Sequence, residues 1–251
     1  NSARFLRCGT ILAAAGRAGR RVAIVTAKEK LRDILSHGLD GIAFSSERAG
    51  EARRETHGIE GVEELVGPTP EIYSGDASVY VLRAGVALLQ RGLADFLYLS
   101  LTDFMQHKYA PQERPSLEFH AAIDRELGHL VDAGATVGIT ADHGMNAKVT
   151  PDGQPRVLYL EAELVGRFGG AHRVICPITD PYVVHHGALG SLVMVHLDPT
   201  SGEEIRAEIA RWIFGLDGVT EVWDRELAAQ KLELPVARIG DLVVLAGRDV
   251  V

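Results

Sequence analysis

The chain has 251 residues, 46% of them hydrophobic and 24% charged, which is the composition of an ordinary globular protein. Its formal net charge of −8 argues against nucleic acid or an anionic membrane surface as a general partner. No window approaches the roughly 18 unbroken apolar residues of a membrane-spanning helix, no signal peptide is visible, and the two cysteines, read as reduced thiols, predict a cytoplasmic protein.

Strands and helices alternate in the first part of the chain. The predicted strands cover 21–27, 40–46, 95–101 and 135–140, and the predicted helices cover 8–21, 28–38, 76–91 and 116–132. Segment 45–75 is polar and rich in Gly and Pro, so we expect a loop with at most one short helix there. Strands alternating with helices of this length predict an α/β fold, with a mostly parallel sheet flanked by helices.

The pattern changes after Met145, where strands become shorter and turns more frequent. A helix is predicted at 202–214, and shorter strands and turns are predicted within 155–170, 172–180, 191–198, 219–224 and 241–246. We interpret this region as an α+β module that is set into or attached to the first domain. The predicted division is therefore a core of residues 1–146 followed by a module of residues 147–251.

Two of the predicted strands end on a carboxylate that has an imidazole close behind it. Asp103 follows "FLYLSL" and Asp142 follows "TVGIT". His107 is four residues after Asp103, which places both side chains on one face if a helical turn follows the strand. His143 is adjacent to Asp142, so these side chains converge only on an irregular turn, which Gly144 permits. Ligands of open parallel α/β sheets bind beyond the carboxyl ends of the strands, where both pairs are expected.

Carboxylate oxygen and imidazole nitrogen are ligands of zinc, which they bind at about 2.0–2.2 Å. Two such metals about 3.5–4 Å apart are suited to a displacement at phosphorus. Each pair alone is a weak signal, because Asp is common at strand ends and at helix starts. Two pairs at equivalent strand ends predict a site for one or two zinc-like ions.

These segments also carry a family resemblance. "TADHGM" resembles the metal-binding motif of the alkaline phosphatase superfamily, which includes the nucleotide pyrophosphatase/phosphodiesterases. "SLTDFMQHKYAP", "ITADHGMNAK" and residues 1–47 are more closely similar to one family within it, the phosphonoacetate hydrolases. The resemblance extends over essentially the whole chain. It implies an alkaline-phosphatase-like fold in which a partial metal-binding core is followed by an incomplete cap.

The resemblance implies two zinc ions in the intact family member. It assigns Asp103 and His107 to one zinc, and Asp142 and His143 to the other. The expected reaction is hydrolysis of the carbon–phosphorus bond of phosphonoacetate to acetate and phosphate.

Lys28 and Lys30 match the family's lysines that hold the anionic groups of a small phosphonate substrate. Their place directly after strand 21–27, on the same edge of the sheet as the metal pairs, agrees with that role. The alternative is that they are solvated lysines in the first turn of a helix. A lysine at a helix N-terminus is unfavourable with respect to the helix dipole, however, which favours a functional role over this alternative.

The sequence departs from the family in one respect. The family's nucleophilic Thr, one further Asp ligand and the last His ligand fall outside the match. Neither Thr10 nor Thr26 stands in the family's nucleophile motif. We therefore expect an internal fragment or truncated piece that has no catalytic residue of its own and is inactive in isolation.

Two alternative functions remain open from the sequence. One is a phosphodiesterase or pyrophosphatase of the same superfamily, against which Lys28 and Lys30 argue because they suit a small dianion. The other is a catalytically incompetent metal-binding chain.

His185 and His186 are interpreted as surface or packing histidines. The sequence leaves a homodimer open.

Overall fold

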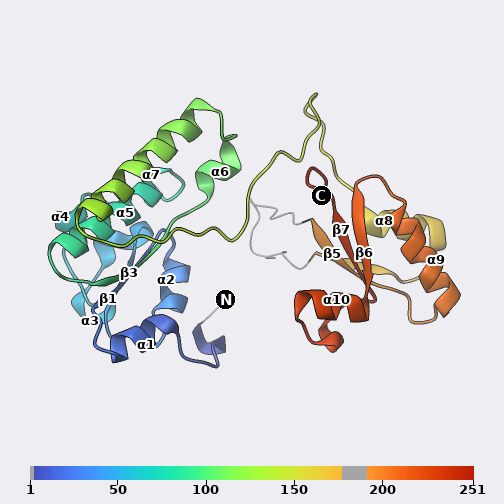
Figure 1. The fold of residues 1–251 in the computed structure, drawn as a ribbon, viewed down its shortest axis with the longest axis horizontal. Helices are drawn as coiled ribbons and strands as arrows, with labels where there is room; N and C mark the ends of the chain where they lie inside the picture. Colours follow the sequence, from blue (N-terminus) through green and yellow to red (C-terminus); the bar gives the residue numbers. More distant parts are fainter. Residues whose placement is uncertain (1–2, 177–190) are drawn as a thin grey trace. The chain divides into compact units, whose positions relative to one another are not determined.

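The computed structural model describes residues 3–176 and 191–251 (Figure 1). The chain divides into two compact units, Asn1–Met145 and Asn146–Val251. Each unit has its own sheet and its own hydrophobic core. Across the described ranges, no helix is both long enough and apolar enough to cross a membrane.

The first unit alternates strands with helices, as the sequence predicts. Its elements are η1 (Ala3–Phe5), α1 (Ile11–Arg17), β1 (Val22–Thr26), α2 (Glu29–Leu35), β2 (Ile42–Ser45), η2 (Ser46–Glu51), α3 (Arg54–His57), α4 (Val62–Val66), α5 (Asp76–Gln90), β3 (Phe96–Ser100), α6 (Phe104–Lys108) and α7 (Arg114–Asp132). The first three predicted strands and all four predicted helices of this region are confirmed.

The first sheet has the strand order β2-β1-β3, and all its strands run parallel. Val25 of β1 lies opposite Phe44 on one side and Leu99 on the other. Every residue of β1 is buried. A central parallel strand is covered on both faces, which explains why β1 reads as the unbroken apolar run "VAIVT".

Helices cover the two faces of this sheet. On one face, Leu12 of α1 and Leu35 of α2 pack with Ile24. On the other, Val81 of α5 packs with Val25. The alternation of side chains along β1 thus divides the apolar residues between two layers.

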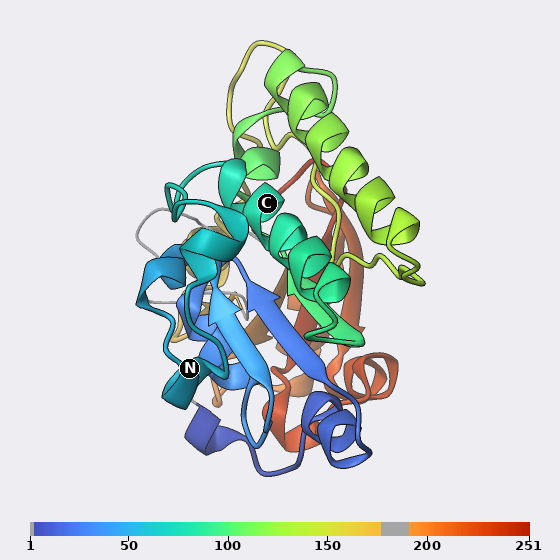
Figure 2. The ribbon, with the colours of Figure 1, turned by 90° about the vertical axis from the view of Figure 1, so that its left-hand side faces the viewer.

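Helix α5 approaches β3 closely, and Gly85 makes this possible. A Cβ atom on Gly85 would lie 2.6 Å from Cδ1 of Leu99. Glycine in a helix interior costs roughly 0.5–1 kcal/mol relative to alanine, so the contact with β3 supplies the reason for it. Farther from the sheet, α7 lies alongside α5 (Figure 2). Leu130 of α7 is buried in the cluster between the two helices.

The prediction for residues 45–75 was wrong in detail. Three short helices, η2, α3 and α4, replace the expected loop with at most one helix. Val62 is buried in the core, and Glu63 accepts hydrogen bonds from the backbone and hydroxyl of Thr69 at 2.8 and 2.7 Å. The few apolar residues that are buried in this segment are not regularly spaced, and side-chain hydrogen bonds fix its turns. The sequence therefore shows little of the periodicity that predicts a helix.

The predicted strand at 135–140 was also wrong. These residues have no regular secondary structure, and Ile139 is 76% exposed. A strand needs a hydrogen-bonded partner, and in the described structure β3 pairs with β1 alone. Phe96 and Tyr98 of β3 accordingly remain 40% and 42% exposed.

The second unit is built on an antiparallel sheet with the strand order β4-β5-β7-β6. Its elements are α8 (Leu160–Phe168), β4 (Arg173–Ile175), β5 (Leu192–His196), α9 (Glu203–Phe214), β6 (Val219–Asp224), α10 (Arg225–Leu232), η3 (Val236–Arg238) and β7 (Leu242–Ala246). The predicted α+β character is confirmed, but much of 155–170 is helix rather than strand. Leu160 and Leu164, four residues apart, are the buried face of α8.

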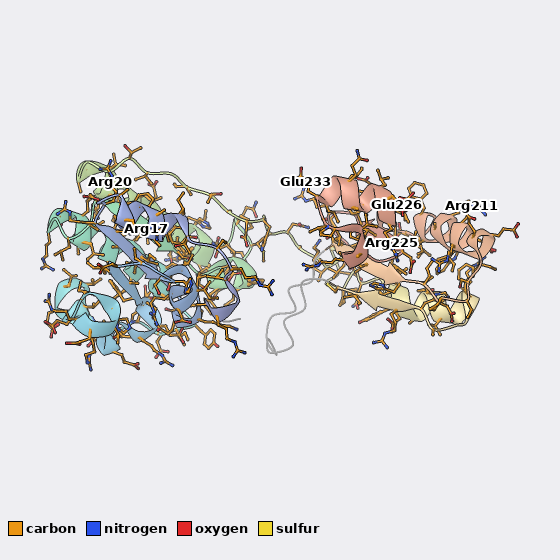
Figure 3. All side chains as sticks on the ribbon, turned by 90° about the horizontal axis from the view of Figure 1, so that it is seen from below. Arg17, Arg20, Arg211, Arg225, Glu226 and Glu233 are labelled. Atoms are coloured by element: carbon orange, nitrogen blue, oxygen red, sulfur yellow. The ribbon has the colours of Figure 1, made fainter. Side chains whose placement is uncertain are left out.

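Helices cover both faces of the second sheet. Ile209 of α9 packs with Val195 and α8 on one face, whereas Ala228 of α10 packs with Val243 on the other. Figure 3 shows the labelled ends of α10: Arg225 and Glu226 begin it, and Glu233 follows it. The same view marks Arg17 and Arg20 near the C-terminal end of α1, where positive charge suits the helix dipole.

Candidate functional site

The carboxyl ends of the three parallel strands meet at one edge of the first sheet. Thr26 lies opposite Ser45 and Ser100, the last residues of the neighbouring strands. Lys28 follows β1 at this edge and Asp103 follows β3. The structure therefore brings one predicted anion-binding residue and one predicted metal ligand to the same edge, which is where ligands of such sheets bind.

Asp103 and His107 form a close pair. Asp103 is the N-cap of α6, and its backbone carbonyl accepts a hydrogen bond from His107 N at 3.0 Å. One helical turn brings Nε2 of His107 to 3.0 Å from Oδ2 of Asp103, with the side chains 34% and 62% exposed. An accessible carboxylate oxygen beside an imidazole nitrogen is the donor chemistry that zinc takes.

The residue before Asp103 is fixed from α5. Ser78 is fully buried, its Oγ donates to the Thr102 carbonyl at 3.2 Å, and the Thr102 N–H donates to the same Oγ at 3.0 Å. These two hydrogen bonds satisfy the N–H and the carbonyl of Thr102, which lies beyond the end of β3 and outside the hydrogen bonds of the sheet. The position of Asp103 thus depends on a serine that sequence reasoning did not single out.

Asp142 and His143 are held far less firmly. Nε2 of His143 lies 3.7 Å from Oδ2 of Asp142, and their side chains are 59% and 90% exposed. Local contacts bend the chain here: His143 N–H donates to Oδ1 of Asp142 at 3.2 Å, and Nδ1 of His143 lies 3.1 Å from the Gly144 carbonyl. The turn is irregular, as the adjacency of the two residues requires.

The two pairs are not assembled into one cluster. Within residues 3–176 and 191–251, no group of three or more His, Cys, Asp or Glu side chains is placed to hold a metal ion. Zinc in proteins takes four ligands, or three and a water. In donor type each pair fits as part of a zinc site, and neither is a complete site.

The two predicted lysines differ in how they are held. Lys28 is half-buried at the N-cap position of α2, its Nζ donates to the Ile72 carbonyl at 3.4 Å, and Nζ lies 4.6 Å from the centre of the Tyr73 ring. Lys30 is exposed in the first turn of the same helix. A contact with the 72–73 segment therefore orients one lysine of the two.

Acidic side chains surround the start of α2. The Glu29 N–H donates to Oε2 of Glu47 at 2.8 Å, which satisfies an amide at the helix start. Burial raises the pKa of Glu29, but hydrogen bonds from Arg32 and Ser45 outweigh it, so that this pKa lies below its ordinary value. These carboxylates offset the unfavourable placing of two lysines at a helix N-terminus.

Thr10 and Thr26, the two threonines weighed as nucleophiles, have structural roles. The buried Thr26 hydroxyl donates to the Lys28 carbonyl at 2.8 Å. Thr10 is the N-cap of α1, and its Oγ1 accepts from Ala13 N at 3.0 Å. His185 and His186 lie outside the described residues.

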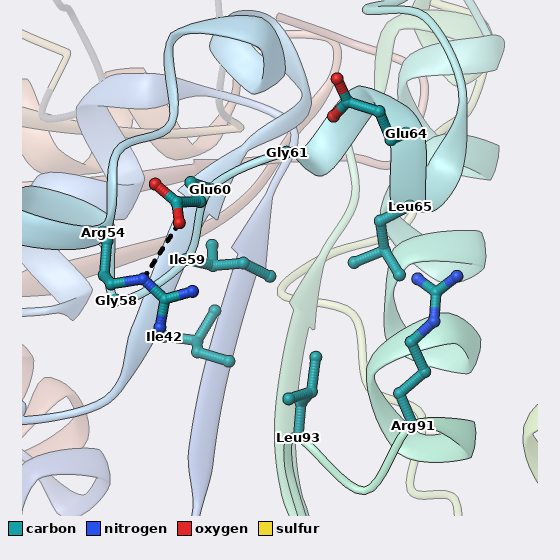
Figure 4. A pocket seen from close by; sticks show the side chains of 10 residues that line it. All are labelled: Ile42, Arg54, Gly58, Ile59, Glu60, Gly61, Glu64, Leu65, Arg91 and Leu93. Carbon is teal, nitrogen blue, oxygen red and sulfur yellow. Dashed lines mark hydrogen bonds and ion pairs between the residues drawn. The ribbon is translucent and has the colours of Figure 1, made fainter.

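A pocket of 270 Å³ lies at the opposite edge of the sheet (Figure 4). Ile42, at the start of β2, and Leu93, which precedes β3, help to line it, and an Arg54–Glu60 ion pair of 3.2 Å crosses one side. This is the amino edge of the strands. The pocket is therefore separate from the predicted metal pairs.

No protein-family model matches the chain. Two solved structures of a phosphonoacetate hydrolase from Sinorhizobium meliloti 1021 are similar to it, one in complex with phosphonoformate and one with phosphonoacetate. Each is 44% identical over 99% of this chain, with a TM-score of 0.87. The resemblance to phosphonoacetate hydrolase is confirmed. The chain spans 61% of the length of that relative.

The likeness also confirms the fold class. A mixed α/β chain with a parallel sheet flanked by helices, superposing on a phosphonoacetate hydrolase with a TM-score of 0.87, has the alkaline-phosphatase-like fold. The ligands of the two relatives are small phosphonates that also carry a carboxylate.

Proposed function

We propose that the protein represented by this chain hydrolyses the carbon–phosphorus bond of phosphonoacetate to acetate and phosphate. The observation that carries the proposal is 44% identity over 99% of the chain to a phosphonoacetate hydrolase solved with phosphonoacetate. No observation favours a phosphodiester or pyrophosphate substrate. A cytoplasmic location belongs to the proposal and rests on the two cysteines alone.

Two zinc ions are the proposed cofactors. Asp103 and His107 would hold one, and Asp142 and His143 the other. Zinc, when bound, lowers the pKa of a coordinated hydroxyl and stabilises the charge on phosphoryl oxygens. The role of this chain's residues is to supply carboxylate and imidazole donors to the metals. In the first pair, Nε2 of His107 and Oδ2 of Asp103 already lie 3.0 Å apart.

Lys28 and Lys30 are the proposed partners of the substrate's anionic groups. Phosphonoacetate carries a phosphonate and a carboxylate, and two ammonium groups at one sheet edge would neutralise both. Lys28 is held in place before any substrate arrives, whereas Lys30 is free to reorient. The second unit, as a cap that selects the substrate, is part of the same proposal.

Phosphate release from phosphonoacetate tests this function. The assay compares the full-length product of the gene that encodes this chain with its Asp103→Ala variant, with and without added Zn²⁺. We expect zinc-dependent release, and a loss of about 100-fold or more in the variant because the metal loses a carboxylate ligand. Asp132→Ala, at an exposed position at the end of α7, is the matched control and should keep its activity.

Two results would contradict the proposal. One is a protein that is folded and zinc-loaded but releases no phosphate from phosphonoacetate. The other is a full-length protein whose activity survives Asp103→Ala unchanged.

A further inference from the structure

A tyrosine outside the predicted site residues lies against Lys28. The Tyr73 ring is 55% exposed and stands in the segment between α4 and α5, far along the chain from β1. The Lys28 Nζ lies 4.6 Å from the centre of this ring, within the distance at which an ammonium is attracted to an aromatic face. A hydrogen bond of 3.4 Å from Nζ to the Ile72 carbonyl supports the same position.

The contacts continue from Tyr73 to the metal pair's helix. The ring centres of Tyr73 and Phe104 are 6.3 Å apart, and the rings are tilted by 43°. Phe104 is the first residue of α6, directly after Asp103, and the Lys108 Nζ lies 5.4 Å from its ring. An unbroken series of contacts therefore joins the end of β1 to the helix that carries Asp103 and His107.

We propose that Tyr73 is a positioning residue that holds the Lys28 ammonium ready for the anionic substrate. A lysine side chain has many rotamers in solution, and part of this rotamer entropy is lost when it binds a ligand. A lysine already resting on a ring has lost some of that freedom beforehand, so substrate binding costs less.

An aromatic ring suits this task better than a carboxylate would. A carboxylate partner would neutralise the ammonium and compete with the substrate. The ring orients the ammonium and leaves its full charge available. Among the described residues, no carboxylate forms an ion pair with Lys28. Lys30 is exposed in the first turn of α2 and, among residues 3–176 and 191–251, lies over no aromatic ring, so Tyr73 distinguishes the two lysines.

The geometric half of the proposal is testable without activity. The chain has five lysines, so ¹³C-dimethylation gives few signals in an NMR spectrum. Lys28 should show an upfield ring-current shift that Tyr73→Leu removes and Tyr73→Phe keeps. Lys231, whose Nζ lies 4.4 Å from the centre of the Trp223 ring, is the internal control and should not respond to either change.

The functional half rests on the proposed hydrolase activity and uses the full-length gene product. Tyr73→Leu should raise KM for phosphonoacetate about two- to five-fold and leave kcat nearly unchanged, as expected for one exposed cation–π contact. Tyr73→Phe should restore the wild-type KM. Val131→Ala, at a position on α7 that is 58% exposed, is the control and should leave KM unchanged.

The possible failures are distinguishable. A wild-type protein without activity on phosphonoacetate overturns the proposed function and leaves the NMR result to judge the Lys28–Tyr73 contact. An active wild type with an unchanged KM in Tyr73→Leu overturns the positioning role. A Lys28 signal that does not move in Tyr73→Leu overturns the contact itself.

Discussion

The two Asp–His pairs at the carboxyl edge differ in how firmly the fold holds them. Asp103 and His107 follow a paired strand and share a helical turn, and their facing atoms are 3.0 Å apart. Asp142 and His143 follow a segment that did not become a strand, and their nearest facing atoms are 3.7 Å apart. Both pairs have the same donor chemistry, so the difference lies in the support behind them.

That support comes from outside each pair. β3 is hydrogen-bonded to β1 and packed against α5, and Ser78 fixes the turn before Asp103. Residues 135–141 have no such partner in the described structure, although Ala135 and Val137 still pack against the core of α5 and α7. A ligand pair becomes preorganised only when its flanking backbone is held on both sides.

The largest expected effect comes from removing the packing behind the first pair. Leu99→Ala should destabilise the first unit by about 2–3 kcal/mol, because Leu99 fills the space between β3 and Gly85 of α5. Ile139→Ala, in the segment that stayed irregular, should cost less than about 0.5 kcal/mol. Both tryptophans, Trp212 and Trp223, lie in the second unit, so tryptophan fluorescence would not report unfolding of the first unit. Hydrogen exchange of α5 peptides is therefore the suitable measurement. Equal costs for the two variants would mean that residues 135–140 are packed like a strand in solution.

The turn before Asp103 provides the second prediction. Ser78→Ala should cost about 1–2 kcal/mol, because both the N–H and the carbonyl of Thr102 lose their partner. Ser46→Ala is a matched control: this serine is also fully buried, but its Oγ makes a single bond of 3.5 Å, to the Ala27 carbonyl. Urea unfolding followed by hydrogen exchange measures both. A control that is as costly as Ser78→Ala would contradict the special role of the Thr102 contact.

Zinc titration compares the pairs directly. If both bind zinc as proposed, the imidazole NMR signals of His107 should respond at a roughly 2- to 10-fold lower Zn²⁺ concentration than those of His143, because fewer side-chain rotamers remain to be fixed. His107→Ala and His143→Ala assign the signals. The reverse order of response would show that the firmness of a pair does not decide its affinity.

The smallest effect concerns α7, the helix between the two pairs. Glu126 is 7% exposed and lies 3.0 Å both from Nε of Arg83 on α5 and from Nδ1 of His129. Burial raises the pKa of Glu126, but hydrogen bonds from His129 and Arg83 outweigh it and leave this pKa below the ordinary value. A lowered carboxyl pKa stabilises the fold above the unfolded-state pKa of about 4.3, and this contribution is lost as the pH falls below it.

Stability measured from pH 6 to pH 3 checks this prediction. The difference in unfolding free energy between wild type and Glu126→Gln should be largest near pH 6 and should shrink below about pH 4. Glu118→Gln, at an exposed i,i+4 pair with Arg114, should show a smaller difference at every pH. A difference that stays constant with pH would contradict the role of the ionised Glu126.

The sequence by itself determined the elements whose signal is local. The apolar run of β1, the long helices α5 and α7, and the four-residue spacing of Asp103 and His107 follow from periodicity and chain direction, and all took the expected form. The resemblance to phosphonoacetate hydrolase could also be recognised from the sequence, because "LTDFMQH" and "TADHGM" are contiguous motifs.

Only the tertiary structure decided which neighbours hold these elements in place. The Ser78–Thr102 hydrogen bonds join residues 24 positions apart, and the Lys28–Tyr73 contact crosses a longer span of chain. No periodic pattern encodes such pairings, because they depend on where two elements meet in space. The same reason explains residues 135–140: their composition suits a strand, but a strand exists only where another backbone is present to complete its hydrogen bonds.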